Sequence, residues 1–143
     1  MTAKEFLSRA YRLDQRINAK ISQAEALNDL ATKCTSVITG MPRSPSSGKN
    51  TMTDVLVKIM DLQAEINNDI DELVDTKREI VTVVKRVENR EYQVLLEKRY
   101  LCYQTWETIS DEMHYGIRWT HVMHKRALTA VETILRVTNK YAQ

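Results

Sequence analysis

Residues 105–128 read TWETISDEMHYGIRWTHVMHKRAL, and this pattern predicts two helices separated by a tight turn. Thr105 is a suitable N-cap for the first helix, because its hydroxyl can accept a hydrogen bond from a free N–H group of the first turn. Apolar residues then recur at the spacing of one helix face: Trp106, Ile109 and Met113. The segment His114-Tyr115-Gly116 ends this pattern, and Gly116 has the conformational freedom that a tight turn needs.

The second helix is predicted to begin near Ile117 and to have one apolar and one polar face. Apolar residues are expected to point inward: Trp119, Val122, Met123 and Ala127. The residues expected to point outward are short, polar or basic: Arg118, Thr120, His121 and Lys125. A helix that lies in a DNA major groove requires such a face. Two amphipathic helices joined by a turn also occur in helical domains that bind no DNA, so the pattern alone leaves both interpretations open.

The distribution of charge favours the C-terminal part of the chain as the anion-binding part. The net charge is only +2. Residues 1–89 contain 13 basic and 13 acidic residues, whereas residues 90–143 contain 8 basic and 6 acidic residues. From Met113 onward, Glu132 is the only acidic residue. The basic residues in the same stretch are Arg118, Lys125, Arg126, Arg136 and Lys140. A local basic patch attracts phosphates whatever the overall balance, although a few cations on a helix are also typical of an ordinary solvated face.

Residues 90–131 carry a family resemblance in addition to these patterns. Their first helical segment contains Arg90-Glu91-Tyr92, Val94, Leu95 and Arg99-Tyr100-Leu101. The two-helix motif then begins with Thr105-Trp106-Glu107 and Ile109-Ser110, and it ends with Val122, His124 and Arg126-Ala127-Leu128. These residues resemble the C-terminal DNA-binding domain, region 4, of bacterial sigma factors. The whole chain is similar to small phage and prophage proteins of Gram-positive bacteria, which resemble the ArpU and RinA type regulators of late phage transcription.

The resemblance implies a helix–turn–helix that binds double-stranded DNA through a defined set of residues. These candidates are Thr105, Gly116, Ile117, Arg118, Thr120, His121, Lys125 and Arg126, with Lys98 as a further phosphate contact. The chain has no room for the other domains of a sigma factor. Its turn is shorter than the sigma pattern, and one residue is inserted between His124 and Arg126, so the resemblance does not fix which side chains reach the bases.

The first 89 residues are predicted to form a long antiparallel helical hairpin. Apolar residues recur every seven positions in two segments, residues 3–39 and residues 51–88, as in helices that pack along a seam. In the first segment they are Ala10, Ile17, Ala24, Ala31 and Ile38, and in the second Met52, Ile59, Ile66, Leu73, Ile80 and Val87. Residues 40–50, GMPRSPSSGKN, hold both prolines and two of the three glycines, and they predict an exposed loop.

The expected fold is therefore all-α, with a helical hairpin over residues 1–89 and a helix–turn–helix domain over residues 90–143. Apolar residues outside the seam, such as Ile21, Leu30 and Leu62, suggest that two hairpins associate in a dimer. The start of the first helix is basic and the first part of the second is acidic. In a hairpin these regions are expected at opposite ends, so that a second copy would bring them together.

Several features predict a protein of the bacterial host cytoplasm. No apolar run approaches the length of about 18 residues that spans a membrane. The N-terminus, MTAKEFLSRAYRLDQR, lacks the apolar core of a signal peptide. Cys34 and Cys102 are expected to be buried thiols.

The function predicted from these observations is sequence-specific DNA binding that regulates phage or prophage genes, with or without contact to RNA polymerase. The alternative is a DNA-packaging or assembly protein similar to small terminase subunits, which also combine a helix–turn–helix with helical oligomerisation. No nucleophile–base pair, phosphate-binding glycine loop or set of metal ligands is recognisable, so we expect neither an enzyme nor a cofactor. The carboxylates Asp69, Asp71, Glu72 and Asp75 are interpreted as a solvated helix face, since no histidine precedes His114.

Overall fold

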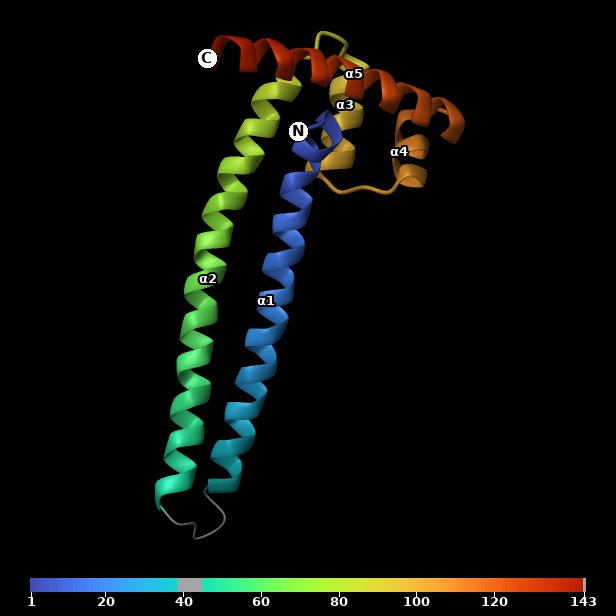
Figure 1. Ribbon diagram of the computed structural model, residues 1–143. Helices are drawn as coiled ribbons and strands as arrows, with labels where there is room; N and C mark the ends of the chain where they lie inside the picture. The colour runs from blue at the N-terminus through green and yellow to red at the C-terminus, as the bar shows by residue number, and fades with distance from the viewer. Residues whose placement is uncertain (39–44, 143) are drawn as a thin grey trace. The chain divides into compact units, whose positions relative to one another are not determined.

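A computed structural model describes residues 1–38 and 45–142, with side chains for residues 1–33 and 52–141. All regular secondary structure in these ranges is helical, which confirms the predicted all-α class (Figure 1). The elements are α1 (Ala3–Ile38), α2 (Pro45–Lys85), α3 (Arg90–Leu96), the π-helical segment η1 (Glu97–Leu101), α4 (Trp106–Met113) and α5 (Ile117–Ala142). Among the described residues, no helix has an apolar stretch that is long enough to cross a membrane.

The second long helix begins earlier than the sequence pattern predicted. Its first residue is Pro45, so residues 45–50 belong to α2 and not to the expected loop. Proline is well suited to this position, because its missing N–H group lies in the first turn, where it has no helical partner. The rest of the expected loop, residues 40–44, lies outside the described residues.

The chain forms two compact units. One comprises Met1–Leu13 and Leu73–Gln143, and the other comprises Asp14–Glu72. The first 13 residues and residues 73–89 thus belong to the same unit as α3, α4 and α5, whereas the sequence patterns grouped them with the hairpin. The functional division at residue 89 stays a prediction.

In the unit Asp14–Glu72, parts of α1 and α2 run side by side in opposite directions (Figure 1). Lys20 joins them, because its Nζ lies 2.6 Å from Asp69 Oδ2 and 3.6 Å from Glu65 Oε2. The hydrogen bond to Asp69 is the main cause of a raised Lys20 pKa. Lys20, the last of the basic residues at the start of the first helix, therefore pairs with acidic residues of the second within one chain. For this residue the expectation that the two charged regions lie at opposite ends was wrong, since the acidic stretch continues to the region opposite Lys20.

Several large apolar side chains of this unit remain exposed. Ile17, Val55 and Ile59 are buried between its helices. The exposed set is Ile21, Leu30, Leu56, Val57, Met60 and Ile70. Two helices alone bury only one stripe of each surface, and the remaining apolar residues therefore face solvent.

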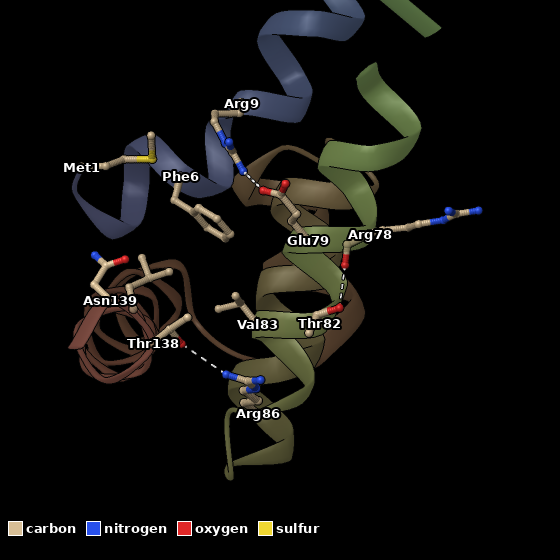
Figure 2. A pocket seen from close by; sticks show the side chains of 11 residues that line it. Met1, Phe6, Arg9, Arg78, Glu79, Thr82, Val83, Arg86, Thr138 and Asn139 are labelled. Atoms are coloured by element: carbon tan, nitrogen blue, oxygen red, sulfur yellow. Dashed lines mark hydrogen bonds and ion pairs between the residues drawn. The ribbon is translucent and has the colours of Figure 1, made fainter. Parts of the chain in front are cut away.

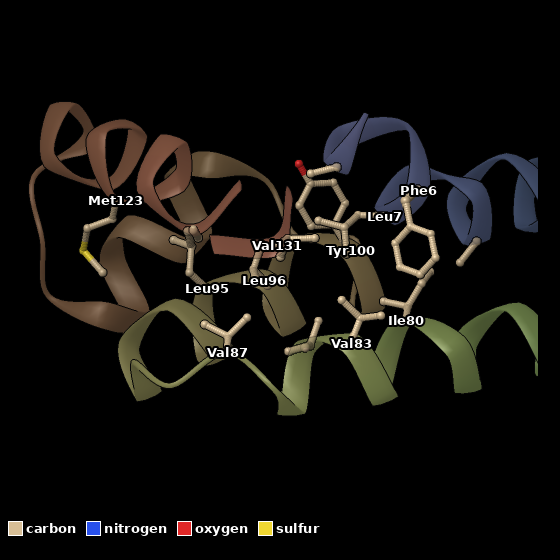
Figure 3. Packing of buried hydrophobic residues seen from close by; sticks show 14 of the residues in the cluster. Phe6, Leu7, Ile80, Val83, Val87, Leu95, Leu96, Tyr100, Met123 and Val131 are labelled. Atoms are coloured by element: carbon tan, nitrogen blue, oxygen red, sulfur yellow. The ribbon is translucent and has the colours of Figure 1, made fainter. Parts of the chain in front are cut away.

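The unit Met1–Leu13 with Leu73–Gln143 contains a continuous hydrophobic core (Figure 3). Phe6 and Leu7 of α1 pack in the same cluster as the apolar residues of the C-terminal helices. Its fully buried large members are Leu7, Ile80, Val84, Val87, Leu95, Leu96, Ile109, Met123 and Val131. The start of the chain therefore contributes directly to the core beneath α4 and α5.

Local hydrogen bonds explain the break between α2 and α3. Asn89 caps α3, and its Oδ1 accepts from Glu91 N at 2.9 Å. Gln93 Nε2 donates to Val87 O at 2.5 Å and to Lys85 O at 3.2 Å. These side chains satisfy backbone groups that a helix end leaves without partners.

The η1 segment widens the helix that α3 begins. Cys102 N donates to Glu97 O at 3.0 Å, a bond across five residues in place of the usual four. The segment directs Tyr100 into the core. Cys102 follows it and is exposed, so the prediction of a buried thiol was wrong at this position. The side chain of Cys34 lies outside the described residues.

Candidate nucleic-acid interface

Helix α4 begins as the sequence predicted. Thr105 is its N-cap, with an extended backbone and a side-chain Oγ1 that accepts from Thr108 N at 3.2 Å. Ile109 is fully buried and Trp106 and Met113 are half-buried, which confirms the expected apolar face. Thr105 itself is exposed, so the start of α4 is accessible to an anion.

The turn between α4 and α5 uses a different residue from the one predicted. His114 takes the left-handed conformation, with φ 60° and ψ 38°, whereas Gly116 has no positive φ. Histidine is among the side chains that tolerate this conformation more often than most. Ser110 Oγ donates to Tyr115 O, and Tyr115 Oη donates to Glu91 Oε1 at 2.8 Å. The turn is thus tied both to α4 and to the start of α3.

The orientation of two residues at the start of α5 is the reverse of the prediction. Thr120 is fully buried and its Oγ1 donates to Gly116 O at 3.0 Å, whereas Trp119 is 43% exposed. The buried face follows the spacing of Thr120, Met123, Ala127 and Val131. Trp119 precedes Thr120 by one residue, so its side chain points about 100° around the helix axis from that of Thr120. Thr120 therefore cannot belong to an outward-facing set, and Trp119 can.

The other candidate residues on α5 are exposed. Ile117, Arg118, His121, Lys125 and Arg126 share the accessible surface with Trp119. The guanidinium of Arg126 lies 5.2 Å from the centre of the Trp119 ring. Residues 113–131 contain no acidic side chain. The accessible surface of the first half of α5 is therefore positive, with an aromatic ring in its midst.

Trp106 links three of the elements around this surface. Arg99 of η1 lies over its ring at 4.6 Å, and the rings of His121 and His124 lie at 4.9 and 4.5 Å. Arg99 Nη1 also donates to Gln104 O at 2.9 Å. His121 is consequently exposed at its edge while it packs against Trp106. The sequence pattern did not identify this cluster, because its members come from η1, α4 and α5.

His124 points into the protein and not towards the candidate surface. It is buried, and its Nε2 lies 2.6 Å from the Tyr100 hydroxyl in a hydrogen bond. Burial, followed by the positive charges of Lys4 and Arg99 and by His121, lowers the pKa of His124 to about 4. Burial raises the pKa of Tyr100 to about 12. Both groups are therefore neutral at neutral pH.

Lys98, a predicted phosphate contact, is engaged within the protein. Its ammonium forms an ion pair with Glu112 of α4. The hydrogen bond from Lys98 is the main cause of a lowered Glu112 pKa. This pair joins η1 to α4, and a phosphate would have to compete with the carboxylate for Lys98.

A separate pocket of about 590 Å³ lies among the start of α1, the end of α2 and the second half of α5 (Figure 2). Phe6 and Val83 contribute apolar side chains to its lining. Arg9 and Glu79 form an ion pair beside it at 2.5 Å, and Arg86 Nη1 donates to Thr138 Oγ1 at 3.2 Å. Two of the arginines that line the pocket, Arg9 and Arg86, are thus engaged within the protein.

Comparison with known proteins places the chain in a family. A family model described as a protein of unknown function (DUF1492) matches residues 43–132, and the chain belongs to this family. The matched residues include the whole of α3, η1 and α4 and the first half of α5. No curated protein and no solved structure shows significant similarity to the chain.

Proposed function

We propose that this DUF1492 protein is a sequence-specific DNA-binding regulator of phage or prophage genes. The observation that carries the proposal is the accessible surface of α5, where Arg118, Lys125 and Arg126 are exposed and residues 113–131 contain no carboxylate. Such a surface attracts the phosphates of a duplex, and a helix of this size fits the major groove.

In this proposal, α5 enters the major groove with its first half. Arg118 bonds a guanine edge, while His121 and Lys125 lie against neighbouring bases or phosphates and Arg126 against the backbone. The N-terminus of α4 at Thr105 approaches a phosphate from the side. Ile117 lies at the groove-facing end of α5, and Gly116 leaves open space there, since an added Cβ would meet no atom within 4 Å.

We further propose that α3, η1, α4 and α5 form a helix–turn–helix domain similar to sigma region 4, and that the helices before it form a hairpin through which two chains associate. The exposed Leu56, Val57 and Met60 support association, because a second copy would remove them from water. Light scattering of the purified protein tests this proposal. A dimer is expected, and a monomer at high concentration would contradict it.

The proposed process is late phage transcription of the ArpU and RinA type, in the bacterial cytoplasm, with RNA polymerase as a further candidate partner. The support for this step is the sequence resemblance of residues 90–131 and of the chain as a whole. A pull-down of host RNA polymerase with the protein on its own DNA site tests the polymerase contact directly.

Selection of bound oligonucleotides from a random DNA pool, at two salt concentrations, tests the DNA-binding function itself. An enriched motif with repeated half-sites is the expected result. Binding that weakens with salt but enriches no motif would favour the DNA-packaging alternative, since phosphate contacts alone carry no sequence information. Absence of binding at both salt concentrations would contradict both.

The variant Arg118→Ala provides a residue-level test on the selected site. Loss of a bidentate arginine–guanine contact should weaken binding by about 1–3 kcal/mol and relax the preference at one base pair. Arg136→Ala is the matched control, because Arg136 is an exposed arginine in the second half of the same helix. Fluorescence anisotropy with the selected duplex measures both. Equal effects of the two variants would show that overall charge, and not Arg118, determines binding.

A further inference from the structure

Trp119 is an unusual residue to find exposed on a positive surface. It is 43% exposed, and the neighbouring Ile117 is 46% exposed. The two residues are two positions apart in the first turn of α5, so their side chains point about 200° apart around the helix axis and do not form one patch. Trp119 is the one that lies against a cation, Arg126, and its large apolar ring can contribute much to contact with a partner.

The structure explains why Trp119 stays outside. Thr120 occupies the inward position, and its hydroxyl is satisfied by Gly116 O at 3.0 Å. Turning α5 to place Trp119 at the centre of its buried side would move Val131, which is completely buried and lies about 120° around the helix from Trp119, towards solvent. The outward orientation of Trp119 therefore follows from the packing of the whole helix.

Arg126 restricts the position of the exposed ring. It lies two turns further along α5, and its guanidinium is 5.2 Å from the ring centre. A cation over an aromatic face is attracted by the ring quadrupole, and the two side chains limit each other's freedom. A ring held in this way loses less conformational entropy when it binds a partner.

We infer that Trp119 reads thymine in the major groove, by contact of its ring with the 5-methyl group. This inference rests on the proposed function. It predicts that the DNA site contains an A·T pair at the position that Trp119 contacts. The thymine methyl is the apolar group that the major groove presents, and apolar side chains recognise it by contact. DNA is favoured over a protein partner because Arg126 lies against the ring, Arg118 and Lys125 are exposed on the same half of α5, and residues 113–131 contain no carboxylate, which together attract phosphates.

Removal of the methyl group from the DNA tests this contact directly. Each thymine of the selected duplex is replaced in turn by deoxyuridine, which keeps all base-pair hydrogen bonds. Wild-type protein should bind about fourfold more weakly at one thymine per half-site, the effect expected for one buried methyl group. Uniform tolerance of deoxyuridine at every position would overturn the inference and leave the DNA-binding proposal intact.

Protein variants assign the methyl contact to Trp119. In Trp119→Ala the deoxyuridine effect at that thymine should disappear, whereas Trp119→Phe should retain part of it. Val137→Ala, which shortens another exposed apolar residue of α5, should keep the full effect. Circular dichroism verifies that each variant is folded, and Trp119→Phe remains informative if the alanine variant is not.

The outcomes separate this inference from the function on which it rests. If Trp119→Ala binds the selected duplex with unchanged affinity and an unchanged deoxyuridine effect, Trp119 does not touch the base and instead serves another partner. If the wild-type protein enriches no DNA site, the proposed function and this inference both fail.

Discussion

At the scale of single residues, Tyr100 and His124 form a buried polar pair beside an apolar core. Their hydrogen bond joins η1 to α5 at 2.6 Å. The pair is stable only while His124 is neutral, because a buried positive charge without a carboxylate partner is costly. The positive groups around the pair, Lys4 and Arg99, add to this cost.

The pair makes the stability of the protein depend on pH in a defined direction. The pKa of His124 is about 4 in the folded protein against 6.5 in an unfolded chain, so the unfolded chain binds the proton first as the pH falls. The stability that neutral His124 provides is therefore present above pH 6.5 and is lost towards pH 4. We expect a decrease of about 3 kcal/mol in the free energy of unfolding.

Urea unfolding at a series of pH values measures this decrease. His124→Gln should flatten the dependence, because glutamine does not titrate in this range. His114→Gln should leave it unchanged, since His114 is exposed. A pH dependence that is identical in the wild type and in His124→Gln would assign the effect to other groups.

Residue orientation on α5 was only partly predictable from the sequence. Hydropathy alone places Trp119 inside and Thr120 outside, and both assignments were wrong. The buried positions at Thr120, Met123, Ala127 and Val131 do follow helical spacing. Hydropathy does not show that a threonine fits this face, because it takes no account of the bond by which a helical threonine hydroxyl donates to the carbonyl four residues back, here Gly116 O.

At the scale of elements, helix starts were more predictable than helix connections. Thr105 and Ile117 mark the starts of α4 and α5 as expected, because capping and apolar spacing are local properties. The π-helical η1, the left-handed His114 and the Trp106 cluster were not foreseen. Each depends on contacts between residues that are distant in sequence or on a backbone conformation that no residue type dictates.

The cap of α4 allows a quantitative prediction. Thr105→Ala removes the hydroxyl that accepts from Thr108 N, and it should lower the free energy of unfolding by about 1 kcal/mol. Thr133→Ala is the matched control, because the Thr133 hydroxyl donates to Thr129 O within α5 and alanine favours a helix interior. Thermal and urea unfolding measure both variants. Equal stability of Thr105→Ala and the wild type would show that the cap is dispensable.

At the scale of the whole molecule, the first residues of the chain belong to the unit that carries the candidate interface. The seven-residue repeat could not reveal this grouping, because the same apolar spacing serves a partner helix or a core. Leu7 is fully buried in the cluster that includes Leu95 and Val131. A fragment reduced to residues 90–143 would therefore lack part of its own core.

Leu7→Ala tests this dependence. We expect a loss of about 2–5 kcal/mol in the free energy of unfolding, through lost burial and the cavity that remains. Val137→Ala truncates an apolar side chain that is exposed on α5, outside the proposed dimer surface, and it should change stability by no more than about 0.5 kcal/mol. Hydrogen exchange should show faster exchange in α3 and α5 of Leu7→Ala. Unchanged exchange there would mean that α1 does not support these helices.

The widened turn at η1 changes the direction in which the side chains of this segment point. Each residue of an α-helix advances the direction by about 100°, whereas the bond from Cys102 N to Glu97 O encloses one residue more than the α-helical pattern does. The directions of Tyr100 and Leu101 are therefore set by the bulge as well as by their position in the chain. The helix ends at Leu101 and residues 102–105 connect it to α4, so a homologous chain shorter by one residue in η1 would redirect Tyr100, while the faces of α4 and α5 would still follow their own helical spacing. An alignment gap at this point need not indicate a different fold.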